Sequence, residues 1–124
     1  MKYVIPMKLP SLANMTTRVH WRKILKIKKN QQQLTLYTLT GLVTKPKKWS
    51  TIMGEMEVPK LPLVVHITRV GPRKLDGDNL QSACKYVRDM IAYIVGTDDG
   101  SPLYTWDSSQ RIGPYSVEVE ITPR

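Results

Sequence analysis

The sequence predicts an α+β fold in a single domain spanning residues 1–124, with a mixed, mostly antiparallel sheet and two main helices packed on it. Three observations support this prediction. The length of 124 residues suits one domain and leaves little room for a second. Two stretches show helical features, and several short segments are β-branched or alternate between apolar and polar residues. No internal repeat or linker divides the chain.

The first half of the chain is expected to hold one strand and one long helix. Residues 2–9 alternate weakly and are followed by the Pro10-Ser11 break. Thr16 or Thr17 can cap a helix that runs from about residue 18 to about residue 39, and Gly41 ends it.

The two sides of this helix differ in their residue types. The basic side chains that share one face are Arg18, Arg22, Lys26 and Lys29. The apolar side chains expected to pack are Trp21, Ile24, Leu25 and Ile27. Residues 41–60 have no regular period and read as a loop whose tip carries Lys45, Lys47 and Lys48.

The second half of the chain is expected to alternate strands with a helix. Residues 61–70 are apolar and β-branched, which predicts a strand. Residues 79–95 have apolar residues at spacings of three and four, which predicts a helix. A short strand is expected near 103–107, and residues 115–121 alternate strictly, as in a half-buried strand.

Local signals also predict the details of these elements. Asp78 and Gln81 fit a capping box at the start of the second helix, and Gly96 suits a left-handed residue at its end. Glu118 and Glu120 are expected to face solvent from the last strand.

Charge is distributed unevenly along the chain. The net charge is +9, and residues 1–62 carry 12 Lys and Arg against two acids, Glu55 and Glu57. All six Asp lie between Asp76 and Asp107. A basic half favours a polyanionic partner, most simply nucleic acid, over a membrane surface. Solubility alone is the simpler alternative.

Composition also bears on the cellular compartment. Cys84 is the one cysteine, so an internal disulfide and a thiolate metal site are both excluded. The apolar run at the N-terminus is broken by Pro6 and is too short for a signal peptide. No apolar run approaches the roughly 20 residues of a membrane span. We therefore expect a cytoplasmic protein without a membrane partner.

The acidic residues of the second half form two short groups, RKLDGDNL at 73–80 and TDDG at 97–100. Asp76 and Asp78 are two residues apart, which in an extended or turn backbone can direct both carboxylates to one side. Pairing of the strand that ends at Val70 with the strand after Gly100 would bring these two Asp to Asp98 or Asp99. Converging carboxylates repel unless a cation lies between them, and Mg²⁺ prefers oxygen ligands.

A structural interpretation of the same residues stays open at this stage. Asp78 can serve only as an N-cap, and Asp76, Asp98 and Asp99 are residue types common in turns. An EF-hand is excluded, because Gln81 and Val87 fall where that loop needs its glycine and its bidentate glutamate.

The motif D-G-D-N-L at Asp76–Leu80, followed after 17 residues by Asp98-Asp99, resembles the core signature of the RusA family of Holliday-junction resolvases. Arg73-Lys74 and Ser109-Gln110 occupy positions similar to that family's pattern. The N-terminal P-S-x-x-N, Pro10 to Asn14, and the following His20-Trp21-Arg22 are also similar. The resemblance covers roughly residues 9–22 and 69–120.

The resemblance implies a site and an activity. Asp76, Asp78 and Asp99 would be catalytic metal ligands for Mg²⁺ or Mn²⁺, with Asp98 supporting them. The protein would act as a homodimer on branched DNA, without a small-molecule cofactor. The family places a catalytic Lys where this chain has Ser82. Lys74 is the favoured substitute because it precedes Asp76 by two residues, and Lys85 is the alternative.

These observations lead to one expected function and two alternatives. We expect a metal-dependent, structure-selective DNA endonuclease. The DNA-binding residues would be Arg18, Arg22, Lys26, Lys45, Lys47, Lys48, Arg73, Lys74 and Lys85. The first alternative is a basic protein that binds junctions or RNA without catalysis. The second is a structural or ribosome-associated basic protein whose Asp residues are only caps and turns.

Overall fold

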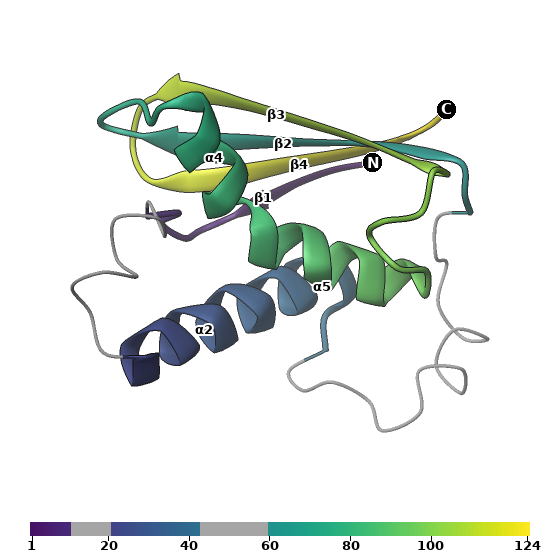
Figure 1. Ribbon diagram of the computed structural model, residues 1–124, viewed down its shortest axis with the longest axis horizontal. Coiled ribbons are helices and arrows are strands. Elements are labelled where there is room, and N and C mark those ends of the chain that lie inside the picture. The colour runs from purple at the N-terminus through teal and green to yellow at the C-terminus, as the bar shows by residue number, and fades with distance from the viewer. Residues whose placement is uncertain (11–20, 43–59) are drawn as a thin grey trace.

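The computed structural model describes residues 1–10, 21–42 and 60–124 (Figure 1). Its strands are β1 (Lys2–Ile5), β2 (Leu63–Gly71), β3 (Tyr104–Ile112) and β4 (Ser116–Pro123). Its helices are α2 (Trp21–Thr40), α4 (Gly77–Ala83) and α5 (Lys85–Val95). The predicted α+β fold in one small domain is confirmed.

The four strands form one sheet in the order β1-β4-β2-β3. The β1–β4 and β4–β2 pairs are antiparallel, and the β2–β3 pair is parallel. The predicted mixed and mostly antiparallel sheet is therefore correct. The turn that joins β3 to β4 passes close to the end of β2, and a Cβ on Gly113 in that turn would lie 3.0 Å from a methyl group of Val70. Glycine is needed there because the backbone approaches so closely.

The core lies between one face of the sheet and the helices, and α5 lies between the sheet and α2 (Figure 1). Alternate residues of β2 and β4 point into this core, as the period of a strand requires. Glu120 is exposed and Glu118 is half-buried in an ion pair with Arg111, so β4 alternates as predicted.

Helix α2 packs differently from the sequence expectation. Trp21 and Leu25, expected on the packing side, are 59% and 43% exposed. The buried side chains of this helix are instead Gln31, Thr35 and Leu36. Leu36 packs with residues of α5 in a second apolar cluster, so the C-terminal half of α2 makes the tertiary contacts. The more polar N-terminal half is largely left at the surface.

The predicted helix over 79–95 is broken in two at Cys84 and begins two residues earlier. The side chain of Arg88 donates hydrogen bonds to the backbone carbonyl and the side-chain oxygen of Gln81 across this break. A helical carbonyl that bonds to a side chain allows the axis to change direction. Gly96 is left-handed at the end of α5, with a φ of 88°, as predicted.

The start of α4 also differs from the prediction. Asp76 is the N-cap residue, and its side chain makes no capping hydrogen bond. Asp78 lies within the first turn, so the predicted Asp78–Gln81 capping box is wrong. Strand β3 is longer than predicted, and β1 is shorter. Within the described ranges, no helix combines the length and apolar character needed to cross a membrane.

Candidate metal centre and nucleic-acid interface

The segment that carries Asp76 and Asp78 is fixed to the end of strand β3. The Gln110 side chain accepts a hydrogen bond from the Leu75 backbone N–H at 2.8 Å and donates one to the Leu75 carbonyl at 2.6 Å. Leu75 also packs partly against the main core. Both backbone groups of the residue before Asp76 are therefore held by one amide side chain.

A buried arginine supports the same segment from β2. Arg69 is only 5% exposed, and it donates hydrogen bonds to the carbonyls of Arg73 at 2.7 Å and Leu9 at 2.8 Å. Burial of a charged group is tolerated when it is hydrogen-bonded. Arg69 thus ties the β2–α4 connection to the segment that follows β1.

The carboxylates of Asp76 and Asp78 are exposed. Asp76 has an extended backbone with φ −62° and ψ 157°, and Asp78 lies two residues later in the first turn of α4. Arg73 and Lys74, immediately before them, are exposed as well. The segment 73–78, which we call the DGD loop, therefore combines two acidic and two basic side chains on an anchored backbone.

The second acidic group forms around the α5–β3 connection. The indole N–H of Trp106 donates to the Asp99 carbonyl at 2.9 Å, and the Tyr104 hydroxyl donates to the Thr97 carbonyl at 2.8 Å. The pKa of Asp89 is raised, and burial is the largest cause. The negative charge of the Asp99 carboxylate and a hydrogen bond with it raise this pKa further. We call the segment 97–100 together with Asp89 the TDDG group.

Burial and the nearby carboxylates of Asp99 and Asp98 also raise the pKa of Tyr104 to about 12. The Tyr104 and Trp106 rings stack with centroids 4.8 Å apart. The TDDG group is thus built on the first half of β3 and on α5.

The two acidic groups do not meet. Because β2 and β3 are parallel, the end of β2 at Gly71 pairs with Ile112, whereas Tyr104 pairs with Leu63 at the start of β2. The two connections consequently lie at opposite ends of the molecule (Figure 1). Their contacts on β3, Gln110 and Trp106, are about 13 Å apart along the strand. Within residues 1–10, 21–42 and 60–124, no three Asp, Glu, His or Cys side chains form a group that could hold a metal.

Within a single protomer, sheet pairing therefore does not bring Asp98 or Asp99 to Asp76 and Asp78, and that expectation is wrong. The pairing itself occurs, but its direction separates the two acidic groups. The DGD loop retains a set of two carboxylates. This donor set fits Mg²⁺, which usually takes one or two protein carboxylates and keeps positions for water and substrate phosphate.

The two lysine candidates fall on different acidic groups. Lys74 belongs to the DGD loop. Lys85 is the first residue of α5, and its positive charge lies close enough to Asp89 to lower the pKa of that carboxyl in part. Ser82 is half-buried on α4. Of the two lysines, Lys74 is the one near Asp76 in the chain, whereas the charge of Lys85 acts on Asp89.

The basic surface of α2 is present where the structure describes it. Arg22, Lys23, Lys26 and Lys29 are exposed, and the Arg22 guanidinium lies 5.5 Å from the Trp21 ring. The start of α2 and the DGD loop lie toward the same end of the molecule (Figure 1). The other predicted contacts Arg18, Lys45, Lys47 and Lys48 lie outside the described residues.

Two residues of this region escaped the sequence analysis. Arg69 reads as an ordinary charged residue in a strand, although a charge at an inward position of an apolar run is a usable signal. Asp89 reads as a surface residue of a helix, and only the folding back of the 97–100 segment brings it to Asp99. Ser109, by contrast, was identified, and its hydroxyl lies 2.7 Å from His66 Nε2 and 3.1 Å from Thr68 Oγ1.

Comparisons with known proteins do not extend this picture. No family model matches the chain, and neither a curated protein nor a solved structure is significantly similar to it.

Proposed function

We propose that this chain is a Mg²⁺-dependent, structure-selective DNA endonuclease that resolves Holliday junctions or other branched DNA by phosphodiester hydrolysis. The observation that carries the proposal is the DGD loop. Its exposed Asp76 and Asp78 stand on a backbone fixed by Gln110 and Arg69, beside the exposed cations Arg73 and Lys74. The resemblance of D-G-D-N-L to the RusA signature agrees with this assignment.

Each residue of the loop has a role in the proposal. Asp76 and Asp78 would hold Mg²⁺ or Mn²⁺, and the chemistry that the ion would supply is charge neutralisation at a phosphodiester and activation of water. Lys74 contacts the scissile phosphate, and Arg73 binds the neighbouring backbone. Asp99, with Asp98, remains a proposed third ligand only in an assembly that brings the TDDG group to this loop.

The rest of the DNA contact is assigned to the exposed cations of α2. Arg22 and Lys26 belong to the first two turns of α2, and the start of α2 lies toward the same end of the molecule as the DGD loop (Figure 1). Phosphate contacts of this kind release counterions, so binding should weaken steeply as salt rises. We further propose a cytoplasmic homodimer, because two coordinated cuts in a two-fold junction need two sites related by the same symmetry.

A nicking assay on a synthetic four-way junction tests the activity, with Mg²⁺ or Mn²⁺ and with EDTA as the control. We expect symmetric nicks in the junction and none in a linear duplex of the same sequence. Metal-dependent cleavage of both substrates at equal rates would refute the structural selectivity. No cleavage of either would refute the nuclease.

A second candidate has two specific observations in its favour. The acidic groups are separate, and Ser82 stands at the family's lysine position, so a basic nucleic-acid-binding protein without catalysis also fits. Charge reversal at Arg22 and Lys26 would then weaken junction binding and flatten its salt dependence, while no metal would give cleavage. Sedimentation with and without junction DNA tests the dimer that only the first candidate requires.

A further inference from the structure

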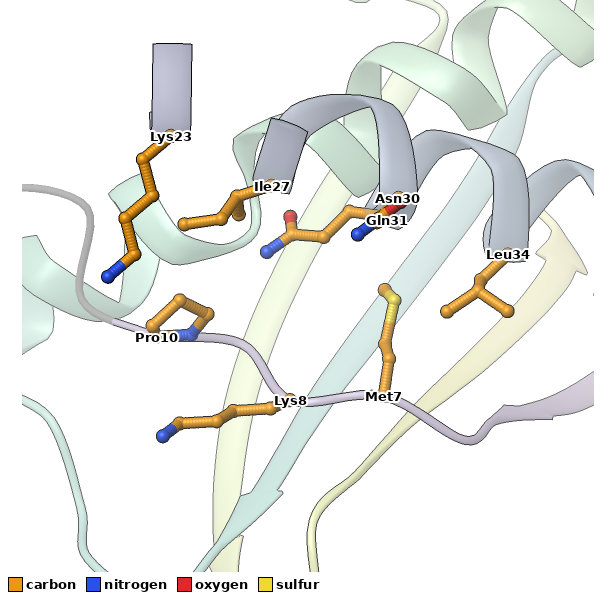
Figure 2. A pocket seen from close by; sticks show the side chains of 8 residues that line it. All are labelled: Met7, Lys8, Pro10, Lys23, Ile27, Asn30, Gln31 and Leu34. Carbon is orange, nitrogen blue, oxygen red and sulfur yellow. The ribbon is translucent and has the colours of Figure 1, made fainter. Parts of the chain in front are cut away.

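A cavity of about 400 Å³ lies between α2 and the segment that follows β1 (Figure 2). Its walls are mostly apolar and include Met7, Pro10, Ile27 and Leu34. The volume is within the range of small-ligand pockets, roughly 300–1,000 Å³. Apolar walls of this kind favour a flat or aliphatic group over a hydrated ion.

One polar side chain in the cavity has no partner. Gln31 is 3% exposed, and neither its Oε1 nor its Nε2 forms a hydrogen bond within the described structure. Figure 2 shows the amide extending from α2 toward the segment that carries Met7 and Pro10. An unpaired buried amide is costly, about 1–3 kcal/mol, so a ligand with a donor and an acceptor at adjacent positions would gain from pairing with it.

Positive charge accompanies this amide. Lys8 and Lys23 also line the cavity, and both residues are exposed. A group that satisfies all three features has an apolar face, a hydrogen-bonding edge and an attached anion. A nucleotide has these properties, whereas an apolar side chain would leave the amide unpaired and a free phosphate would not use the walls.

We propose that this cavity accepts an unpaired nucleobase of the nucleic-acid substrate, with adenine preferred, and that Lys8 and Lys23 contact the adjacent phosphates. The inference rests on the proposed function for its substrate class and adds a base-reading site to it. A Gln amide pairs bidentately with adenine, accepting from N6 and donating to N7. A base enters such a cavity only when it leaves the stack, and this costs least where a base is already unpaired, as at a branch point.

The test compares binding of two short strands in EDTA, where no cleavage interferes. The probes are a five-nucleotide deoxyadenosine strand and an abasic strand of equal length and charge. The wild-type protein should bind the adenine strand at least about tenfold more tightly. Gln31→Met keeps the length of the side chain but removes both polar atoms, and it should remove that preference while leaving abasic binding unchanged.

Two further variants complete the test. Gln32→Met, on the same helix but outside the cavity lining, should bind both strands like the wild type. Ile27→Trp should fill the cavity and remove the adenine preference by steric exclusion. The melting temperature of Gln31→Met should equal or exceed that of the wild type, because an unpaired buried amide is lost. A lower value would mean that the amide is satisfied in the free protein and would overturn the inference.

The remaining outcomes separate this inference from the proposed nuclease. Equal binding of both strands by a protein that cleaves junctions would overturn the base pocket and leave the nuclease intact. Adenine preference in a protein that never cleaves would support the pocket and refute the nuclease. If Gln31→Met leaves strand binding unchanged but self-associates more strongly, the cavity accepts an apolar protein side chain and the base pocket is refuted.

Discussion

The DGD loop and the TDDG group have similar composition but opposite environments. Asp76 and Asp78 are exposed beside Arg73 and Lys74, on a backbone that Gln110 holds. In the TDDG group, Asp89 lies against Asp99, and burial together with that neighbouring carboxylate raises the pKa of Asp89. The first arrangement leaves its carboxylate oxygens available to a cation and its basic side chains available to a phosphate. The second uses its carboxylates mainly toward one another.

This difference shows that acidic residues are not interchangeable candidates for a metal site. Burial and the neighbouring Asp99 carboxylate disfavour the ionised form of Asp89, whereas Asp76 and Asp78 are exposed beside two cations. Under the proposed function, the chemistry belongs to the DGD loop and the TDDG group has a supporting role. Four sets of substitutions, in order of decreasing expected effect, test this division.

The largest effect is expected for the ligands of the DGD loop. Asp76→Asn and Asp78→Asn should each reduce junction cleavage at least about a thousandfold, equivalent to about 4 kcal/mol of barrier. Each change removes a metal ligand and a negative charge near phosphate, so junction binding should be equal or tighter. Single-turnover rates and EDTA binding assays measure the two effects.

Asp98→Asn and Asp99→Asn are the matched changes in the other group, and they should keep cleavage within about tenfold of wild type. A loss at Asp99 as large as at Asp76 would show that the two groups act together, in a dimer or on bound DNA.

Lys74 and Lys85 give the next comparison, since Lys74 belongs to the DGD loop and the charge of Lys85 acts on Asp89 of the TDDG group. Lys74→Ala should slow single-turnover cleavage at least about tenfold, or about 1.4 kcal/mol of barrier, with a much smaller effect on binding. Lys85→Ala should cleave normally. Ser82→Lys in the Lys74→Ala background should restore the rate. A defect confined to Lys85→Ala would reverse the assignment of the lysine.

Gln110 holds the DGD loop without being a ligand, so its effect should appear in metal affinity. Gln110→Ala should raise the Mg²⁺ concentration for half-maximal cleavage about tenfold, because the backbone before Asp76 is released. Stability should fall by about 1 kcal/mol, since two hydrogen bonds to Leu75 are lost. Gln32→Ala provides a control on α2. An unchanged Mg²⁺ dependence would show that Gln110 supports folding alone.

The smallest effect is expected in the TDDG group and depends on pH. A carboxyl whose pKa is raised by folding favours the folded state when protonated and disfavours it when ionised. Asp89→Asn should therefore stabilise the metal-free protein at pH 7 by about 0.5 kcal/mol, the scale of a screened charge pair. Thermal unfolding should show this gain diminishing as the pH falls through the range in which Asp89 protonates. A constant difference at all pH values would exclude repulsion from Asp99 as its cause.

The sequence predicts the elements of this fold better than their contacts. Residues 61–70 are apolar and β-branched, and residues 115–121 alternate strictly; both form strands because one face of each is buried. The break at Cys84 has no Pro or Gly to signal it, and it coincides with the hydrogen bonds that the Arg88 side chain donates to Gln81. Exposure of Trp21 and Leu25 could not be foreseen either, because packing of α2 occurs at its other end.

The candidate site depends on the direction of strand pairing. Residues 61–70 and the strand after Gly100 are separated by a helix, and strands joined by a helical crossover usually pair in parallel. That rule places the residues after the first strand and those before the second at opposite ends of the sheet. The separation of Asp76 from Asp99 was therefore available from the order of the elements, whereas the anchoring by Arg69 and Gln110 needed the structure.

The sheet order has a consequence for how the chain folds. Residues 60–124 contain β2, β3 and β4 together with α4 and α5, so most of the core can assemble from that segment. Strand β1 lies at the edge of the sheet, beside β4. The Met1 amino group donates a hydrogen bond to the Ile121 carbonyl, which is 120 residues away in the chain. Closing so long a loop is entropically costly before any contact is gained, and long-range pairing of this kind slows folding. The acidic residues of both groups belong to the segment that can form early, and we expect the basic helix α2 to pack on it afterwards.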